Sequence, residues 1–220
     1  MIKTVIFDMD GVIVDSEPLY EQHLQAFLVK LGVSQPELIE VSLKGVSSRD
    51  TSKLLIETFQ LEYEVDELVT ISRKAYLDHL DSIKKLPSIP GVVEFVKYLN
   101  KSGFSLALAS SASAKRIDLF LSKLRLKQFF PVIVCGDDVK RSKPDPDIFL
   151  LAAQKLGAKP SDCVVIEDSQ VGVRAAKAAG MKCIAYAGSA HNSDDLSEAD
   201  LVVKDFKALT KSLKYQTLPV

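Results

Sequence analysis

Ionisable and hydroxyl-bearing residues follow four apolar runs of this sequence, at or beyond the points where buried strands would end. In chain order they are Asp8, Asp10, Ser110, Ser111, Lys143, Glu167 and Asp168. In an open parallel sheet the carboxyl ends of the strands meet at one edge, and ligands bind there. The pattern therefore predicts one site that combines four carboxylates, a pair of hydroxyls and an ammonium group.

The charge of this cluster indicates a bound cation. Four ionised carboxylates and one lysine leave three uncompensated negative charges, an arrangement that is costly in a cleft. A divalent ion would reduce this excess to one charge, and a proton on one aspartate would bring it near zero. Oxygen ligands alone favour Mg²⁺ over zinc or copper, so we expect Mg²⁺ as the cofactor.

The apolar runs have the form of fully buried strands. They do not alternate apolar with polar residues, which is typical of strands covered by helices on both faces. Apolar residues at helical spacing separate the runs, as in Val92, Phe95, Val96 and Leu99. This alternation predicts an α/β fold, a doubly wound, Rossmann-like parallel sheet. The predicted strands are 5–7, 106–109, 132–134, 164–166, 183–185 and, with a weaker pattern, 201–203.

Residues 17 to about 84 interrupt this alternation with helical patterns alone. The proline- and glycine-rich stretch 86–91 suits a hinge or linker. We expect the connections near Asp15 and near Pro87 to lie close together at the carboxyl edge of the sheet. The predicted domains are an α/β catalytic core of residues 1–15 and 86–220 and an all-helical cap of residues 16–85 inserted after the first strand.

Composition and charge argue against several classes of function. The chain has 220 residues and a formal net charge of −1, and no basic run points to nucleic acid or an anionic membrane. No apolar stretch approaches the ~20 residues of a membrane helix. The opening MIKTVIFDMDG is too charged for a signal peptide. We therefore expect a cytoplasmic monomer whose partner is a small molecule.

The cysteines and histidines fit no disulfide or zinc pattern. They are Cys135, Cys163 and Cys183, and His23, His79 and His191. The cysteines lie in or beside apolar runs, so we interpret them as buried, reduced thiols. The histidines have no partner pattern, and we interpret them as packing or surface residues rather than catalytic ones.

Four motifs together resemble the haloacid dehalogenase superfamily. They are Asp8-Met9-Asp10-Gly11-Val12, Ser110, Lys143-Pro144-Asp145-Pro146 and Ile166-Glu167-Asp168-Ser169. Each alone is weak, but each follows its own strand, and they occur in the family's order over essentially the whole chain. Two further stretches, Asp15-Ser16-Glu17-Pro18-Leu19-Tyr20 and Gly45-Val46-Ser47, resemble the subgroup that holds beta-phosphoglucomutase and small sugar phosphatases.

The resemblance implies covalent phosphoryl transfer. Asp8 would attack phosphorus and become an aspartyl phosphate. Asp10 would protonate the leaving oxygen and then deprotonate water or a second hydroxyl, its proton being retained because another carboxylate lies nearby.

The resemblance also implies ligands for the phosphate and the metal. Ser110 and the Ser111 amide would hold phosphoryl oxygens, and Lys143 would neutralise both the phosphate and Asp8. The family pattern gives the Mg²⁺ ligands as Asp8, the Asp10 carbonyl and Asp168, with Glu167 close behind.

The inserted helices would act as a lid that closes on substrate and excludes water. The residues expected to contact substrate are Arg49, Gly45 and Ser47 from the cap, and Ser113 and Lys115 from the core. Simpler interpretations stay open for three of them. Arg49 could face solvent beside a capping-box-like pair, Ser113 could cap a helix, and Lys115 could be solvated.

Three functions compete for the same residues. We expect a Mg²⁺-dependent phosphatase of a small phosphorylated metabolite, a sugar phosphate. The alternative is a sugar phosphomutase, but those enzymes carry a histidine on the first cap helix where this chain has Tyr20, and their cap lysine has no clear match in residues 72–76. A phospho-accepting signalling module is a third reading, although such modules span roughly 120 residues and lack a helical insertion. A dehalogenase shares the aspartate nucleophile, but we discount it because it would need neither an acid/base Asp10 nor Mg²⁺.

Overall fold

The computed structural model describes residues 2–36, 48–189 and 194–213, and the chain divides into two compact units. The core unit comprises Met1–Ser16 and Lys85–Val220, and the helical unit comprises Glu17–Lys84. Each unit has its own hydrophobic core and is described by itself below.

The core unit is built on six parallel strands in the order β3-β2-β1-β4-β5-β6. The first strand thus lies inside the sheet, between the strands that carry the hydroxyl cluster and the Glu167-Asp168 pair. All six predicted strands are present and the predicted fold class is confirmed. The strands are β1 (Thr4–Phe7), β2 (Ser105–Ala109), β3 (Val132–Val134), β4 (Cys163–Glu167), β5 (Lys182–Tyr186) and β6 (Leu201–Val203).

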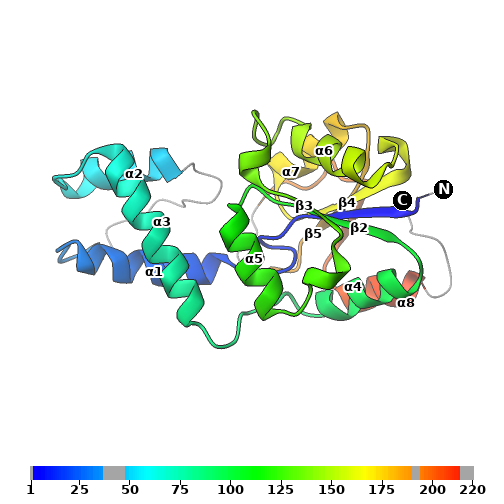
Figure 1. Cartoon of the computed structure of the whole chain (residues 1–220), viewed down its shortest axis with the longest axis horizontal. Helices are drawn as coiled ribbons and strands as arrows, with labels where there is room; N and C mark the ends of the chain where they lie inside the picture. Colours follow the sequence, from blue (N-terminus) through cyan, green and yellow to red (C-terminus); the bar gives the residue numbers. More distant parts are fainter. Residues whose placement is uncertain (1, 37–47, 190–193, 214–220) are drawn as a thin grey trace. The chain divides into compact units, whose positions relative to one another are not determined.

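Helices cover both faces of this sheet, which explains why the strands are apolar on both sides (Figure 1). On one face Ile6 and its neighbours pack against α6 and α7. On the other, the ring of Phe7 meets Phe95 of α4, which in turn meets Phe206 of α8. The helices of the core unit are α4 (Val92–Lys101), α5 (Ala114–Lys123), α6 (Asp147–Leu156), α7 (Gln170–Ala178) and α8 (Phe206–Leu213), with short 3₁₀ turns at Lys127–Phe129, Gly136–Asp138 and Pro160–Asp162.

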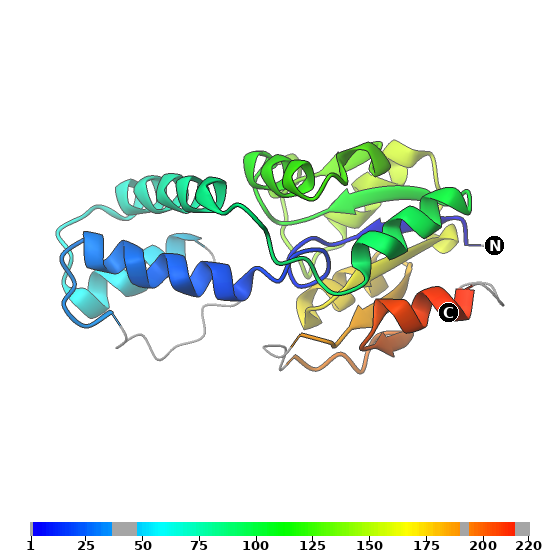
Figure 2. The same cartoon turned by 90° about the horizontal axis from the view of Figure 1, so that it is seen from below.

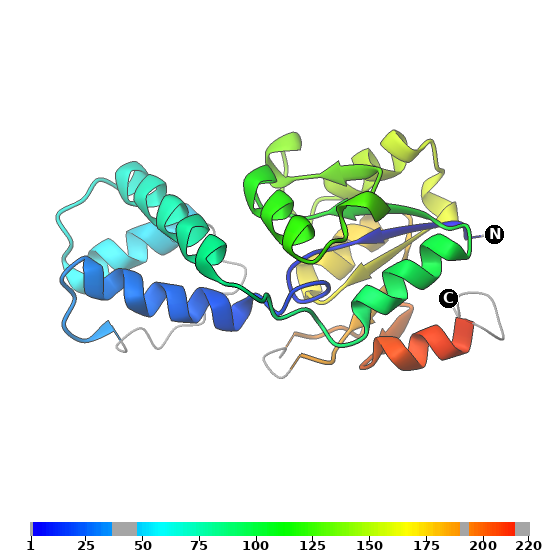
Figure 3. The same ribbon diagram turned by 60° about the horizontal axis from the view of Figure 1, so that its bottom comes forward.

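The chain leaves and re-enters the core unit at neighbouring points (Figure 3). The amide of Asp15 donates to the Pro87 carbonyl at 2.9 Å, and the amide of Ile89 donates to the Ile13 carbonyl at 3.0 Å. An antiparallel bridge joins Val14 to Ser88 between them. The expectation that the two connections run side by side is therefore confirmed.

The helical unit consists of α1 (Glu17–Lys30), α2 (Ser48–Phe59) and α3 (Val65–Ser82) (Figure 2). Its core is formed by Leu24, Phe27, Leu28, Leu55 and Leu68. As predicted, the described part of this unit contains helices and no strand. None of the helices among the described residues of either unit is long and apolar enough to cross a membrane.

All three cysteines are buried and free, as interpreted from the sequence. Burial raises the pKa of the Cys163 thiol to about 11, so it stays protonated at neutral pH. Burial also raises the pKa of Cys183 and, more modestly, that of Cys135. Thiolate chemistry has no support at these positions.

His23 is a packing residue of the helical unit, as interpreted from the sequence. The residue is 4% exposed, and its ring stacks on Phe27 at 5.6 Å between centroids and approaches Tyr76 and His79 at 5.0 and 5.6 Å. Burial, followed by the proximity of His79 and Lys30, lowers the pKa of His23 from 6.5 to about 4. His191 lies outside the described residues.

Because His23 is buried, it makes the free energy of unfolding depend on pH in the mildly acidic range. The unfolded chain takes up a proton on His23 below pH 6.5, whereas the folded chain resists until about pH 4, so stability falls as the pH drops through that window. We expect a loss of about 2 kcal/mol between about pH 7 and pH 5 from this group. Urea unfolding of the parent and of His23→Leu at both pH values measures it as the difference between their pH dependences, because the raised pKa of Asp8 acts in the opposite direction in both proteins. The same pH dependence in parent and variant would contradict the assignment.

Candidate active site

Asp8, Lys143 and Glu167 form a buried ionic cluster at the carboxyl edge of the sheet. Phe7 of β1 pairs with Ile166 of β4, so the next residues of the two strands, Asp8 and Glu167, are neighbours. The Lys143 ammonium donates to Asp8 Oδ1 at 2.6 Å and to Glu167 Oε1 at 2.6 Å. The side chains of Lys143, Asp8 and Glu167 are only 7%, 8% and 1% exposed. Three segments distant in the sequence therefore converge as predicted.

The three ionisable groups differ in how well their charges are satisfied. Burial, with Glu167 and Asp10 adding to it, raises the pKa of Asp8 to about 7 against the opposing effect of Lys143. For Lys143, burial disfavours the charged form, but the carboxylates of Asp8 and Glu167 outweigh it and raise the pKa. For Glu167, burial likewise disfavours the charged form, but Lys143 and Ser169 outweigh it and lower the pKa. Asp8 is therefore the carboxylate that most needs a further cation.

Glu167 is held by protein donors on both of its oxygens. Its Oε1 binds Lys143, while its Oε2 accepts hydrogen bonds from the Asp168 amide at 2.7 Å and from the amide and hydroxyl of Ser169 at 2.9 Å each. Ser169 also caps α7, because its hydroxyl accepts from the Gly172 amide at 3.1 Å. In this arrangement Glu167 orients Lys143, and its expected place beside a metal stays a prediction.

Asp168 lies against the turn that carries Asp10. A methyl group built on Gly11, whose φ is +72°, would come within 2.0 Å of Asp168 Oδ2. Asp168 itself is 7% exposed. The side chain of Asp168 thus packs on the backbone of Gly11, directly after Asp10. Asp168 itself follows Glu167, the residue of β4 that lies beside Asp8.

These residues fit the Mg²⁺ ion that the sequence implies. No three His, Cys, Asp or Glu side chains among the described residues are arranged to hold a metal, but the expected ligand set needs only two carboxylates, those of Asp8 and Asp168, with the Asp10 carbonyl. Hard oxygen donors and water complete magnesium sites of this kind. A cation beside Asp8 would stabilise its ionised carboxylate and so oppose the burial that raises the pKa of Asp8.

Gly11 offers a test of the close approach between the turn and Asp168. Gly11→Ala combines an unfavourable positive φ with a clash, whereas Gly103→Ala has the same backbone problem, at φ +82°, with nothing within 4 Å. We expect Gly103→Ala to cost about 1 kcal/mol and Gly11→Ala at least about 1 kcal/mol more, with catalysis lost because Asp168 is displaced. Denaturant unfolding and phosphatase assays of both variants measure this. Equal costs in the two variants would rule out a tight contact.

Arg116 is a site residue that sequence reasoning missed. Its guanidinium Nη2 donates to Asp10 Oδ2 at 2.5 Å from the first turn of α5. The charge sum made from the sequence omitted this second cation. Helical spacing is the signal that could have found it, because Arg116 lies four residues before the buried Phe120 on α5.

The predicted phosphate ligands occupy the start of the β2–α5 loop. Ser110 is 1% exposed, and its hydroxyl accepts a hydrogen bond from the Ala112 amide at 3.2 Å. Ser111 is exposed, and so are Ser113 and Lys115. Ser113 occupies the N-cap position of α5 without a side-chain capping bond. The roles of these four residues stay predictions.

The predicted cap contacts are only partly described. Arg49 lies in the first turn of α2 and forms an exposed ion pair with Asp66 of α3, inside the helical unit. The contact of Arg49 with substrate stays a prediction. Gly45 and Ser47 lie outside the described residues.

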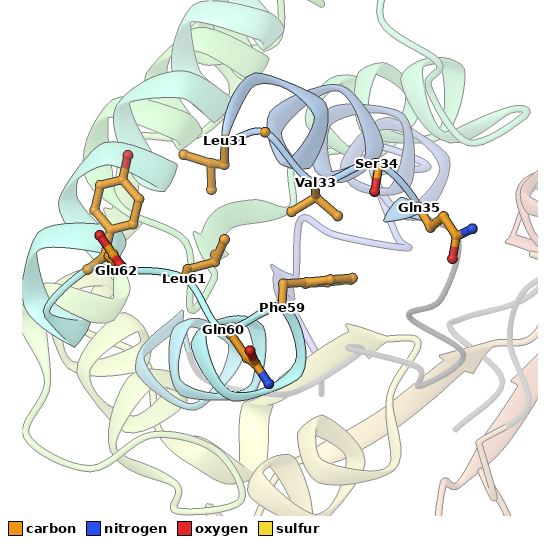
Figure 4. Close-up of a pocket in the computed structure, with 10 residues that line it drawn as sticks. Leu31, Val33, Ser34, Gln35, Phe59, Gln60, Leu61 and Glu62 are labelled. Carbon is orange, nitrogen blue, oxygen red and sulfur yellow. The ribbon is translucent and has the colours of Figure 1, made fainter.

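A surface pocket is also present within the helical unit, at the turns that follow α1 and α2 (Figure 4). None of the predicted site residues that the structure describes lines it. Its lining is Leu31, Gly32, Val33, Ser34, Gln35, Phe59, Gln60, Leu61, Glu62 and Tyr63. Among the described residues, this lining holds one carboxylate, that of Glu62, and no lysine or arginine.

Comparisons with known proteins agree with this geometry. A family model described as haloacid dehalogenase-like hydrolase matches residues 5–186. The phosphorylated carbohydrates phosphatase of Thermotoga maritima is 35% identical over 195 residues, 88% of each chain. The beta-phosphoglucomutase of Bacillus subtilis is 29% identical over 98% of this chain and 95% of its own. The crystal structure of CbbY from Rhodobacter sphaeroides in complex with phosphate superimposes with a TM-score of 0.81 at 25% identity, covering 95% of this chain and 96% of that one.

Proposed function

The chain belongs to the haloacid dehalogenase-like hydrolase family, and from that premise we propose that it is a Mg²⁺-dependent phosphatase of small sugar phosphates. Membership supports an enzyme of the phosphoric monoester hydrolase class. The observation that carries the proposal is the buried Lys143 ammonium, which lies 2.6 Å from both Asp8 and Glu167 at the carboxyl edge of the sheet.

The first half-reaction uses Asp8 as nucleophile. A carboxylate oxygen of Asp8 forms a bond to phosphorus while the bond from phosphorus to the sugar oxygen breaks, and Asp10 gives its proton to that oxygen. Lys143 stays charged throughout, because Asp8 and Glu167 raise its pKa. Its ammonium is thus available to neutralise phosphoryl oxygens as Asp8 changes from an anion to an acyl phosphate.

The second half-reaction hydrolyses the aspartyl phosphate. A water proton passes to Asp10, the water oxygen bonds to phosphorus, and the Asp8–phosphorus bond breaks to release phosphate. Mg²⁺ held by Asp8, the Asp10 carbonyl and Asp168 would supply charge neutralisation for the phosphoryl oxygens. Ser110 and the Ser111 amide would complete the phosphate cradle.

We further propose that the helical unit acts as a cap that determines substrate specificity through Arg49, Gly45 and Ser47. The packing of this unit favours hydrolysis over mutase chemistry. Tyr20, at the position where the mutases have a histidine, lies edge-on to Tyr76 at 5.4 Å, and the nearby His23 is buried among Phe27, Tyr76 and His79. Neither side chain offers an exposed imidazole.

Metal removal tests the proposal. After treatment with EDTA, phosphate release from a panel of sugar phosphates should fall by at least about 100-fold and return when Mg²⁺ is added. Retained activity in excess chelator would contradict the role of the metal.

The same preparation separates the phosphatase from the mutase. With beta-glucose 1-phosphate, a trace of the bisphosphate and Mg²⁺, a phosphatase releases inorganic phosphate. Glucose 6-phosphate formed without free phosphate would establish the mutase instead.

A further inference from the structure

Asp10 is held asymmetrically in the core unit. Its Oδ2 accepts the 2.5 Å hydrogen bond from Arg116, whereas its Oδ1 is buried and, among the described residues, has no hydrogen-bond partner. The side chains of Asp10 and Arg116 are 31% and 24% exposed, so the pair is partly shielded from water. A charge-assisted bond in such a setting fixes the plane of a carboxylate.

A buried carboxylate oxygen without a donor is costly unless a partner arrives during function. The partner available in the proposed reaction is the water that attacks the aspartyl phosphate. We propose that Arg116 is a positioning residue for Asp10, which holds Oδ2 so that Oδ1 accepts the proton of this water. The inference rests on the proposed phosphatase function and adds a residue to its second half-reaction.

The choice of substrate isolates that half-reaction. p-Nitrophenolate leaves without protonation, so transfer from p-nitrophenyl phosphate to Asp8 does not need an acid. Hydrolysis of the aspartyl phosphate still needs one water O–H bond to break, with its proton passing to Asp10 Oδ1. A defect in the orientation of Asp10 should therefore slow the second step and spare the first.

Arg116→Ala should lower kcat for p-nitrophenyl phosphate by about 10-fold or more, and KM should fall with it, so that kcat/KM changes by less than about 3-fold. Stopped-flow measurement should then show a burst of p-nitrophenolate of about one equivalent per active site. Arg116→Lys, which keeps a cation in place, should recover part of kcat.

Two control variants distinguish positioning from general damage. Arg174→Ala removes another arginine of the core unit, which pairs with Glu198 at 2.8 Å on the exposed face of α7, and it should leave kcat unchanged. In an Asp10→Asn background, Arg116→Ala should cause no further loss of kcat, because the group that it positions is already disabled.

A fall in kcat/KM equal to the fall in kcat, with no burst, would overturn the inference while leaving the phosphatase proposal in place. Additive losses in the Asp10→Asn background would overturn it as well. A parent enzyme that fails to release phosphate over many turnovers would overturn the proposed function itself, and the inference with it. Circular dichroism of Arg116→Ala verifies that the fold is retained in each comparison.

Discussion

Asp8→Asn should lower kcat for phosphate release by about 10⁴-fold or more. The carboxylate oxygen that would attack phosphorus is replaced by an amide, which is not a nucleophile, and no aspartyl phosphate can form. Rapid acid quench after incubation with ³²P-labelled substrate measures the covalent phosphate on the protein directly. The parent should carry label, and the variant should carry none.

This loss should occur without unfolding. Burial raises the pKa of Asp8 to about 7, so the ionised carboxylate is poorly accommodated in the metal-free protein, and a neutral amide of the same shape removes that difficulty. We expect the Tm of the variant in EDTA to match or exceed that of the parent. Activity within about 10-fold of the parent in a separately purified preparation would remove Asp8 from the role of nucleophile.

The sheet could be predicted from sequence because its strands are buried on both faces. Runs such as Val164-Val165-Ile166 are continuous in apolar character, and the polar residues that follow them mark the carboxyl edge. The convergence of Asp8, Lys143 and Glu167 follows from that topology together with the family motif. Nothing in the sequence, by contrast, indicated the two hydrogen bonds of the Ser169 hydroxyl, which donates to Glu167 and accepts from the Gly172 amide at the start of α7. Both bonds depend on the local path of the turn.

Side chains that reach the site from helices were harder to predict. Arg116 meets Asp10 across 106 positions of sequence, and it belongs to none of the motifs that marked the site. Arg49 was expected to contact substrate because of its place beside Gly45-Val46-Ser47, and its ion pair with Asp66 on a neighbouring helix was not foreseen. Charged side chains are long and adaptable, so their partners depend on tertiary packing that apolar patterns do not encode.

Lys143→Met should destabilise the core unit by about 3–5 kcal/mol, because it leaves the buried carboxylates of Asp8 and Glu167 without their shared cation. Loss of packing is a minor part of this cost. Methionine has a similar length, and it can keep the contact that Lys143 makes over the ring of Phe149, 4.8 Å from its centroid. Urea unfolding in EDTA measures the change, and phosphatase activity should fall by at least about 100-fold in the same variant.

A matched control and a double variant identify the cause. Lys177→Met breaks an ion pair with Asp200 of nearly the same length, 2.7 Å, but Lys177 is 39% exposed, so this change should cost at most about 1 kcal/mol. Asp8→Asn combined with Lys143→Met removes one of the stranded carboxylates, and the double variant should be at least about 1 kcal/mol more stable than the sum of the two single effects. If the two single effects instead add, repulsion between Asp8 and Glu167 is not what Lys143 relieves. The ammonium would then act on the phosphoryl group alone, and the stability of the cluster would have to come from the backbone and hydroxyl donors around Glu167.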